Sequence, residues 1–288
     1  MKKTTKLRNL ISGPGIHQAV AAHDALLARL VERAGFDIVS VSGNTVAASY
    51  LGMPDMGFLN LSDMINVCTR IASAVNAPVL VDADTGYGNA MQITRTVRDF
   101  ERAGVAGIVI EDQIDYKKCG MIETSHPVLP AEEYAAKLRA ACMARTDPDF
   151  VICARTDATH DHGLEEAIRR VHIAHEAGAD MIDIALQGTK EQVEQVAAAN
   201  LPIPLKGNMD EGKQLWKIDN DVLERSGFKV LSQPGLLRYI TTGAAIRALE
   251  HVAREGTTRG IHDQMCTVEE YFDAVDLNKY LELEKKIF

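Results

Sequence analysis

This 288-residue chain lacks the features that mark nucleic-acid-binding or membrane proteins. Its formal charge is −9, which argues against general binding to a phosphate backbone, because such binding needs a basic face. A local group of lysines and arginines can still bind a small anionic substrate on an acidic protein. No apolar run approaches the length that spans a bilayer. The first residues, 1–6, resemble the start of a secretory signal, but no apolar segment follows them, so we expect a cytoplasmic protein.

Several residue patterns that carry well-known chemistry are also missing. The five cysteines are an odd number with no CxxC spacing, so we expect reduced thiols that mostly pack as small core residues. The nine histidines show no metal-ligand spacing and no HExxH occurs, so we expect no zinc site. A GxSxG nucleophile elbow and a GKS or GKT phosphate loop are absent too.

Short apolar segments alternate with longer amphipathic ones along the chain. The short segments lack in/out alternation, which is typical of parallel strands buried on both faces. Glycines follow several helical segments, where a left-handed cap is expected. We predict strands over Asn9–Ser12, Ile38–Ser42, Val79–Asp84, Gly107–Glu111, Phe150–Thr156, Met181–Ala185, Ile203–Gly207 and Lys229–Ser232. We predict helices over Gln18–Ala34, Ser62–Val75, Met91–Ala103, Ala131–Thr146, Leu164–Ala177, Thr189–Ala199, Glu211–Ser226 and Leu236–Glu255.

This order of elements favours an α/β fold, the (β/α)8 TIM-type barrel. Eight strand–helix units in about 250 residues match the size of that barrel. The alternative is an open doubly wound sheet, which usually starts with a glycine-rich phosphate loop. Here Ser12-Gly13-Pro14-Gly15 lacks the GxGxxG spacing. We therefore predict one barrel domain over residues 1–288. Its tail from Gly260 to Phe288 is apolar enough to pack against another protein surface, and a neighbouring subunit is a candidate for that surface.

Carboxylates gather where the catalytic groups of a parallel barrel lie, at the C-terminal ends of strands. Asp82 and Asp84 point to the same side of one strand because side chains alternate with a period of two. Glu111 ends the next strand, and Asp55 lies in a turn that can reach the same mouth. An all-oxygen cluster suits Mg²⁺, or Mn²⁺. The alternative is a solvated strand end or a helix N-cap at Asp84.

A thiol lies close to the fourth predicted strand. Cys119 belongs to the segment Tyr116-Lys117-Lys118-Cys119-Gly120, and a thiol flanked by cations can shuttle a proton near neutral pH. Arg155 ends a buried strand, so we expect it to pair with the acidic cluster or to bind a substrate carboxylate. The other polar residues at strand ends are Ser42, Gly43, Asn44, Asp112, Thr156, Asp157 and Asn208.

These residues together resemble the isocitrate lyase / phosphoenolpyruvate mutase superfamily, and within it the bacterial 2-methylisocitrate lyase / dimethylmalate lyase branch. The resemblance runs from about Leu10 to the C-terminus. The motifs that carry it are Ser42-Gly43, the turn Gly52-Met53-Pro54-Asp55-Met56-Gly57, Val81-Asp82-Ala83-Asp84-Thr85-Gly86-Tyr87-Gly88, Ile110-Glu111-Asp112-Gln113, Lys117-Lys118-Cys119-Gly120 and Ala154-Arg155-Thr156-Asp157-Ala158.

The resemblance implies a barrel whose last helix, here within residues 235–288, is exchanged between paired subunits of a homotetramer. It implies Mg²⁺ held directly by Asp82, with Asp55, Asp84 and Glu111 acting largely through water. It implies a 2-oxo acid whose carboxylate lies against Ser42, Gly43 and Asn44, with Arg155 on the substrate. Asp82 and Asn208 complete the predicted substrate site, and Lys118 and Arg155 join Cys119 as the predicted catalytic residues.

The chemistry implied by the resemblance is retro-aldol cleavage of a 2-hydroxy acid. The carbon–carbon bond breaks to give a 2-oxo acid and a carboxylate-stabilised carbanion. In the lyase branch the cysteine of this motif is the general acid/base, which is Cys119 here, and the loop that carries it closes over the substrate.

The chain departs from the lyase pattern at three positions. Met121 stands where the family has histidine, Ala185 lies near a family glutamate, and Ser40 replaces an aromatic residue. The residues that read the second carboxylate are therefore altered. We predict a lyase for a substituted malate-type or other 2-hydroxy acid. The alternatives are oxaloacetate decarboxylation or hydrolysis, phosphonate chemistry, or a non-catalytic barrel that senses a metabolite.

Overall fold

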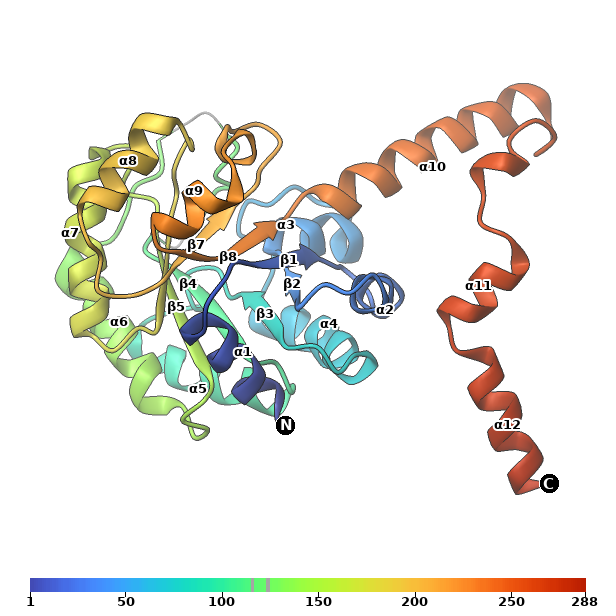
Figure 1. Cartoon of the computed structure of the whole chain (residues 1–288), viewed down its shortest axis with the longest axis horizontal. Coiled ribbons are helices and arrows are strands. Elements are labelled where there is room, and N and C mark those ends of the chain that lie inside the picture. The colour runs from blue at the N-terminus through green and yellow to red at the C-terminus, as the bar shows by residue number, and fades with distance from the viewer. Residues whose placement is uncertain (115–116, 123–124) are drawn as a thin grey trace.

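Eight parallel strands close into a barrel in chain order, which confirms the predicted (β/α)8 fold. The computed structural model describes residues 1–114, 117–122 and 125–288 (Figure 1). Tyr116, which the sequence analysis included in the thiol segment, lies outside these residues. The strands are β1 (His17–Ala21), β2 (Ile38–Val41), β3 (Val79–Asp82), β4 (Gly107–Glu111), β5 (Val151–Thr156), β6 (Met181–Ile184), β7 (Leu205–Asn208) and β8 (Phe228–Gln233).

Helices surround the strands and bury an apolar layer against them. The seven later strands lie within two residues of their predicted bounds. The helices of the barrel are α1 (Lys3–Ser12), α2 (Ala25–Arg33), α3 (Gly43–Val46), α4 (Leu61–Ala74), α5 (Ala90–Arg102), α6 (Ala131–Ala144), α7 (Gly163–Glu176), α8 (Lys190–Ala198) and α9 (Asn220–Arg225). A π-helical turn, η1 (Ala47–Leu51), follows α3, and a 3-10 turn, η2 (Leu215–Lys217), precedes α9.

The prediction of the first strand was wrong. Residues 9–12 belong to α1, which buries Leu7 and Ile11 in the lower barrel core. Their i, i+4 spacing places both side chains on one helix face. The first strand is instead β1, so the helix predicted from Gln18 begins only at Ala25, where the Asp24 side chain accepts a hydrogen bond from the Leu27 amide at 2.8 Å.

The helix predicted over Glu211–Ser226 was wrong in its first half. Only the turn η2 and the short helix α9 form there, because Asp219 takes an extended backbone conformation between them. The loop that replaces the lost helical turns brings Lys213 to the open end of the barrel, where it lines the main pocket. This difference therefore changes the set of residues at the site.

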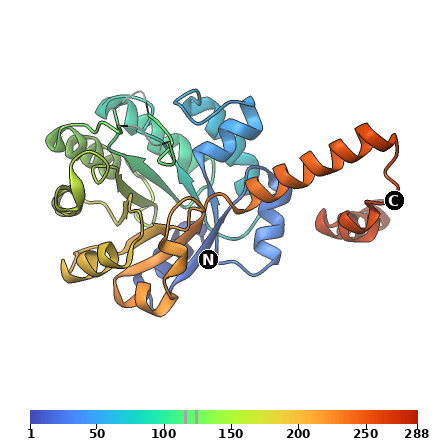
Figure 2. The same ribbon diagram turned by 90° about the horizontal axis from the view of Figure 1, so that it is seen from above.

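The C-terminal segment leaves the barrel. α10 (Leu236–Glu255) extends away from the ring of helices, as Figures 1 and 2 show, and it has no buried residue. A 3-10 turn, η3 (His262–Gln264), α11 (Val268–Ala274) and α12 (Leu277–Ile287) follow it. α11 contacts α2 of the same chain, where Arg29 Nε donates to the Ala274 carbonyl oxygen at 3.1 Å. Within the described residues, no helix is long and apolar enough to cross a membrane.

Candidate active site

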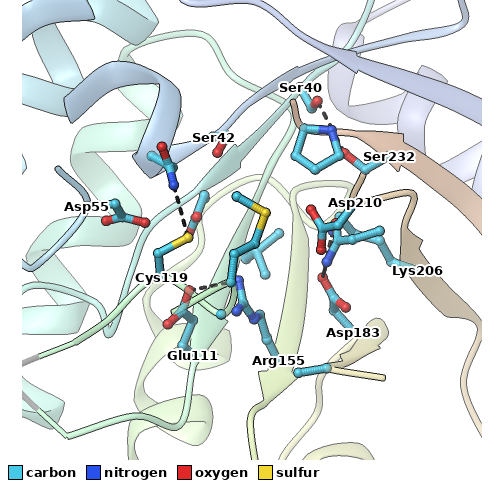
Figure 3. A pocket seen from close by; sticks show the side chains of 18 of the residues that line it. Ser40, Ser42, Asp55, Glu111, Cys119, Arg155, Asp183, Lys206, Asp210 and Ser232 are labelled. Carbon is cyan, nitrogen blue, oxygen red and sulfur yellow. Dashed lines mark hydrogen bonds and ion pairs between the residues drawn. The ribbon is translucent and has the colours of Figure 1, made fainter. Parts of the chain in front are cut away.

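The main pocket lies where the strands end, and it collects most of the predicted site residues. Figure 3 shows side chains from several strand ends pointing into it, with Cys119, Glu111 and Arg155 close together. The predicted residues that line the pocket are Ser42, Asn44, Asp55, Asp82, Glu111, Cys119, Arg155 and Asn208. Two further predicted residues, Gly43 and Asp84, lie directly behind this lining against the carboxylates.

Three carboxylates from two neighbouring strand ends form a compact cluster. One ligand oxygen each from Asp82, Asp84 and Glu111 lies within 4.8 Å of the others. The backbone builds this arrangement, because Asp84 takes a left-handed conformation with φ of 48° and its amide donates to Asp82 Oδ1 at 3.0 Å. The Glu111 amide then donates to the Asp84 carbonyl oxygen at 2.8 Å, which fixes the two strands relative to each other.

The residue at position 43 must be small for this cluster to form. A Cβ atom added to Gly43 would lie 2.8 Å from Asp84 Oδ1 and 3.4 Å from Asp82 Oδ2. It would also lie 3.2 Å from Lys117 Nζ. These distances explain why residue 43 is glycine, since only glycine lets the chain after β2 approach the charged groups this closely.

A buried lysine that the sequence analysis did not select lies inside the carboxylate cluster. Lys117 is only 4% exposed, and its Nζ lies 3.3 Å from Asp55 Oδ1 and 3.7 Å from Glu111 Oε1. It is 3.9 Å from Asp82 Oδ2 and bonds directly to Asp84 Oδ1. The predicted Lys118 points elsewhere, because its Nζ lies 3.5 Å from the Ser125 carbonyl oxygen and it does not line the pocket.

The ammonium and the carboxylates shift one another's proton affinity. Burial raises the pKa of Asp84 to about 6, although Lys117 opposes the shift. Burial also raises the pKa of Glu111 well above its usual range. For Asp82, burial would raise the pKa, but Lys117 and Arg155 together lower it. Burial alone would lower the pKa of Lys117, and the four carboxylates instead raise it well above the ordinary value.

The Cys119 thiol faces this cluster from the loop after β4. Asn44 Nδ2, at the start of α3, donates a hydrogen bond to Cys119 Sγ at 2.9 Å. The Cys119 amide donates to the Asp55 carbonyl oxygen at 3.1 Å, which ties the loop to the turn that carries one of the metal candidates. Cys119 is partly exposed to the pocket, unlike the buried Cys68 and Cys153. The structure thus brings the thiol and the carboxylates into one site.

Arg155 connects the metal candidates to the floor of the site. Its Nη1 lies 2.9 Å from Glu111 Oε1 and its Nη2 lies 3.0 Å from Asp157 Oδ1. Arg155 also lines the pocket, so the structural pairing and the substrate contact considered from the sequence are compatible. A planar guanidinium can serve two carboxylates at once.

The part of the pocket beside β6 and β7 holds a second ionic network. Asp183 Oδ2 accepts hydrogen bonds from Lys206 Nζ at 2.6 Å and from Asn208 Nδ2 at 2.9 Å. Figure 3 shows Asp183 and Lys206 at this side. Asn208 was predicted from the sequence, but the charged lining residues were not, namely Lys117, Asp183, Lys206, Asp210, Lys213 and Arg238. Lys206 and Asp183 lie inside predicted buried strands and were the available signals, since such charges need partners.

The whole chain is similar to several known proteins. The family model described as phosphoenolpyruvate phosphomutase matches residues 7–255. The 2,3-dimethylmalate lyase of Eubacterium barkeri is 38% identical over 284 residues, which cover 99% of this chain and 98% of that protein. A structure of oxaloacetate acetylhydrolase with 3,3-difluorooxalacetate has a TM-score of 0.92 at 30% identity, covering 99% of this chain and 97% of the other. A phosphonopyruvate hydrolase complex with oxalate and Mg²⁺ has a TM-score of 0.89 at 30% identity, covering 99% and 98%.

Proposed function

The chain belongs to the phosphoenolpyruvate phosphomutase family, and from this membership we propose that it is a divalent-metal-dependent carbon–carbon lyase acting on a substituted 2-hydroxy acid. The observation that carries the proposal is the placement of the Cys119 thiol in one pocket with the carboxylates of Asp82 and Glu111. A proton donor next to a place for a cation suits the formation and capture of a carbanion.

The residues present fit a hard divalent cation. The donor set is carboxylate oxygen only, and Gly43 leaves a space that any side chain would fill. We propose that Asp82 holds Mg²⁺ (or Mn²⁺), with Asp55, Asp84 and Glu111 around it. When bound, the cation would supply stabilisation for negative charge on the substrate oxygens.

The protein's own residues would hold the substrate and move its proton. We assign the 2-oxo acid end to Ser42, Gly43 and Asn44, since these lie at the start of α3 beside the carboxylates. Arg155 would bind a substrate carboxylate. The substrate hydroxyl would lose its proton to a carboxylate of the cluster as its C–O bond becomes a carbonyl, and when the carbon–carbon bond breaks, the electron pair stays on the departing carbon. The Cys119 S–H would give its proton to that carbon, and Asn44 would orient the sulfur.

The nature of the substrate follows from the rest of the lining. Met121, Ala185 and Ser40 all line the pocket, so the three departures from the lyase pattern meet at one site. They make part of the wall small or apolar, which suits an alkyl substituent. Lys213 and Arg238 add positive charge to the same pocket, which suits a second carboxylate. We propose a substituted malate as the substrate class.

A substrate panel tests this proposal. The purified chain with Mg²⁺ would be offered substituted malates, 2-methylisocitrate, isocitrate, oxaloacetate and phosphonopyruvate. Release of a 2-oxo acid from a 2-hydroxy diacid, assayed by reduction with a coupled dehydrogenase, is the expected result. Oxalate or CO₂ released from oxaloacetate, or phosphate released from phosphonopyruvate, would instead assign the site to the hydrolytic or decarboxylating reactions. Ligand-induced stabilisation without turnover would indicate a sensor.

We expect the affinity for Mg²⁺ to depend on pH because of Asp84. Its raised pKa of about 6 means that the carboxyl is ionised near neutral pH and protonated in more acidic solution. A cation must then displace the proton, so the affinity should fall by up to about tenfold for each pH unit below about 6. Calorimetric titration near neutral pH and at about pH 5 measures the change.

The matched control for this dependence is Asp84→Asn, which removes the titrating group. The variant should bind Mg²⁺ more weakly near neutral pH and lose part of the acid dependence. An affinity of the natural chain that is the same at both pH values would contradict the assignment.

We also propose a homotetramer in which α10 is exchanged between paired subunits. α10 does not cover its own barrel, and its exposed Ile240, Ile246 and Leu249 need a partner surface. Light scattering of the full chain and of a chain ending after β8 tests the exchange, since loss of the segment 235–288 should leave smaller species. A tetramer that survives this truncation would count against the helix exchange.

We also propose that the enzyme is cytoplasmic. All five cysteines are free thiols, which supports this location.

A further inference from the structure

Two histidines and an aspartate converge beside the main pocket, outside the residues assigned to the lyase site. His126 follows the loop that carries Cys119, and Asp157 and His160 lie in the loop after β5. One ligand atom from each lies within 4.8 Å of the others. The two imidazole rings stack with their centroids 4.2 Å apart. His126 and Asp157 are fully buried.

Each of the three side chains also carries one buried atom without a hydrogen-bond partner. His126 Nδ1, Asp157 Oδ2 and His160 Nε2 are all buried and unpartnered. The opposite atoms of two of these side chains are already engaged. His126 Nε2 lies 3.0 Å from the Ile122 carbonyl oxygen, and Asp157 Oδ1 accepts from Arg155 Nη2 at 3.0 Å. A buried polar atom left without a partner is costly, so three together indicate a ligand between them.

The engaged atoms also fix which lone pairs are free. A carbonyl oxygen can only accept, so the hydrogen on the His126 ring must lie on Nε2. This leaves a lone pair on Nδ1, which no hydrogen bond within the described residues occupies. Metal-binding histidines donate their second ring N–H to a carboxylate, a backbone carbonyl or water, and the Ile122 carbonyl oxygen is such a partner. The three groups thus have the donor chemistry of two neutral imidazoles and one carboxylate.

We propose that His126, Asp157 and His160 bind a zinc ion, as a second metal site distinct from the carboxylate cluster. Two imidazoles and a carboxylate are a common set of three protein ligands for Zn²⁺, with water in the fourth position. The carboxylate cluster offers only oxygen and suits Mg²⁺, so ligand type separates the two sites. The spacing of histidines in the sequence does not reveal this site, because His126 and His160 come from different strand–helix units.

The two cations nearest to these groups, Arg155 and Lys213, disfavour positive charge at His160, but both are paired with carboxylates. Arg155 lies next to Asp157 but is also paired with Glu111 at 2.9 Å. Lys213, the other nearby cation, is paired with Asp210 at 3.6 Å. Each positive group therefore has a carboxylate of its own, and Asp157 carries its second oxygen free of hydrogen bonds.

Zinc at this position would join the Cys119 loop to the β5 loop. The Ile122 amide donates to the Cys119 carbonyl oxygen at 2.9 Å, and the Ile122 carbonyl oxygen in turn lies against His126. Asp157 forms an ion pair with Arg155, and Arg155 forms a second ion pair with Glu111. Binding would hold the segment behind the thiol in one position relative to Arg155.

The test is metal binding by the full chain in an excess of Mg²⁺. Metal-free protein would be titrated with Zn²⁺, and in parallel with Co²⁺, whose visible spectrum reports four-coordinate nitrogen and oxygen ligation. We expect one ion per chain at micromolar metal, with intense visible bands for Co²⁺. His126→Gln and His160→Gln should each weaken binding by at least about tenfold and remove the bands. Glutamine keeps the size of the side chain, and circular dichroism checks that each variant folds.

Two controls separate this site from other ligands. His162→Ala removes an exposed histidine two residues from His160 and should change nothing. Asp82→Asn weakens the carboxylate cluster and should leave the zinc and the cobalt spectrum unchanged. Zinc that is lost with Asp82→Asn but kept in the two glutamine variants would overturn the proposal. The failure of the folded natural chain to take up any zinc would do so too, leaving water among the three groups.

Discussion

Cys119→Ala is expected to lower kcat for cleavage by about 100- to 10,000-fold, the usual contribution of a positioned proton donor. The thiol lies beside the carboxylate cluster but is not part of it, so affinity for Mg²⁺ should change little. KM should also change little, because Cys119 would act on the departing carbon rather than on the bound 2-oxo acid. Steady-state kinetics with the substrate found in the panel, together with calorimetric titration of Mg²⁺, measure these effects.

Cys266→Ala is the matched control, because it removes an exposed thiol from the C-terminal tail. It should turn over like the natural chain. Cys119→Ser places a hydroxyl of similar size next to Asn44. A hydroxyl is a far weaker acid than a thiol, so the kcat of this variant should stay close to that of the alanine variant. Undiminished turnover by either Cys119 variant would refute the role given to the thiol, while leaving the metal site and the family untouched.

The barrel was predictable because each strand carries its signal locally. Most of the seven later strands are short apolar runs without alternation, and the parallel order then follows from the helix between each pair. The first strand was missed because His17–Ala21 is polar at its start and merges with the apolar pattern of α2. Periodicity cannot separate a short buried strand from the helix that follows it.

The sequence showed which strand ends carry the site. It did not show which of two adjacent lysines points into it. Lys117 and Lys118 are adjacent and chemically identical, so their spacing cannot show which one turns inward. The choice depends on loop contacts such as the Gln113 side chain, which holds the Lys118 amide at 3.0 Å and its carbonyl oxygen at 3.1 Å. Lys213 was missed for a related reason, since the predicted helix over Glu211–Ser226 hid the loop that carries it.

Lys117→Met is expected to destabilise the metal-free chain by about 3–5 kcal/mol, because the variant keeps a buried carboxylate cluster and removes its buried counter-ion. Methionine preserves most of the volume and removes the charge. The loss should shrink as the pH falls, since Asp84 and Glu111, whose pKa values burial already raises, can then take up protons. Urea unfolding in the presence of a chelator, near neutral pH and at about pH 5, measures both effects.

The same variant should respond more strongly to Mg²⁺ than the natural chain. With the ammonium gone, the cation no longer competes with Lys117 for Asp84, so saturating Mg²⁺ should recover a large part of the lost stability. Lys118→Met is the control, because the Lys118 Nζ lies by the Ser125 carbonyl oxygen rather than in the cluster. Equal stability losses in the two variants, or a loss in Lys117→Met that Mg²⁺ does not reduce, would show that Lys117 is not the counter-ion of this site.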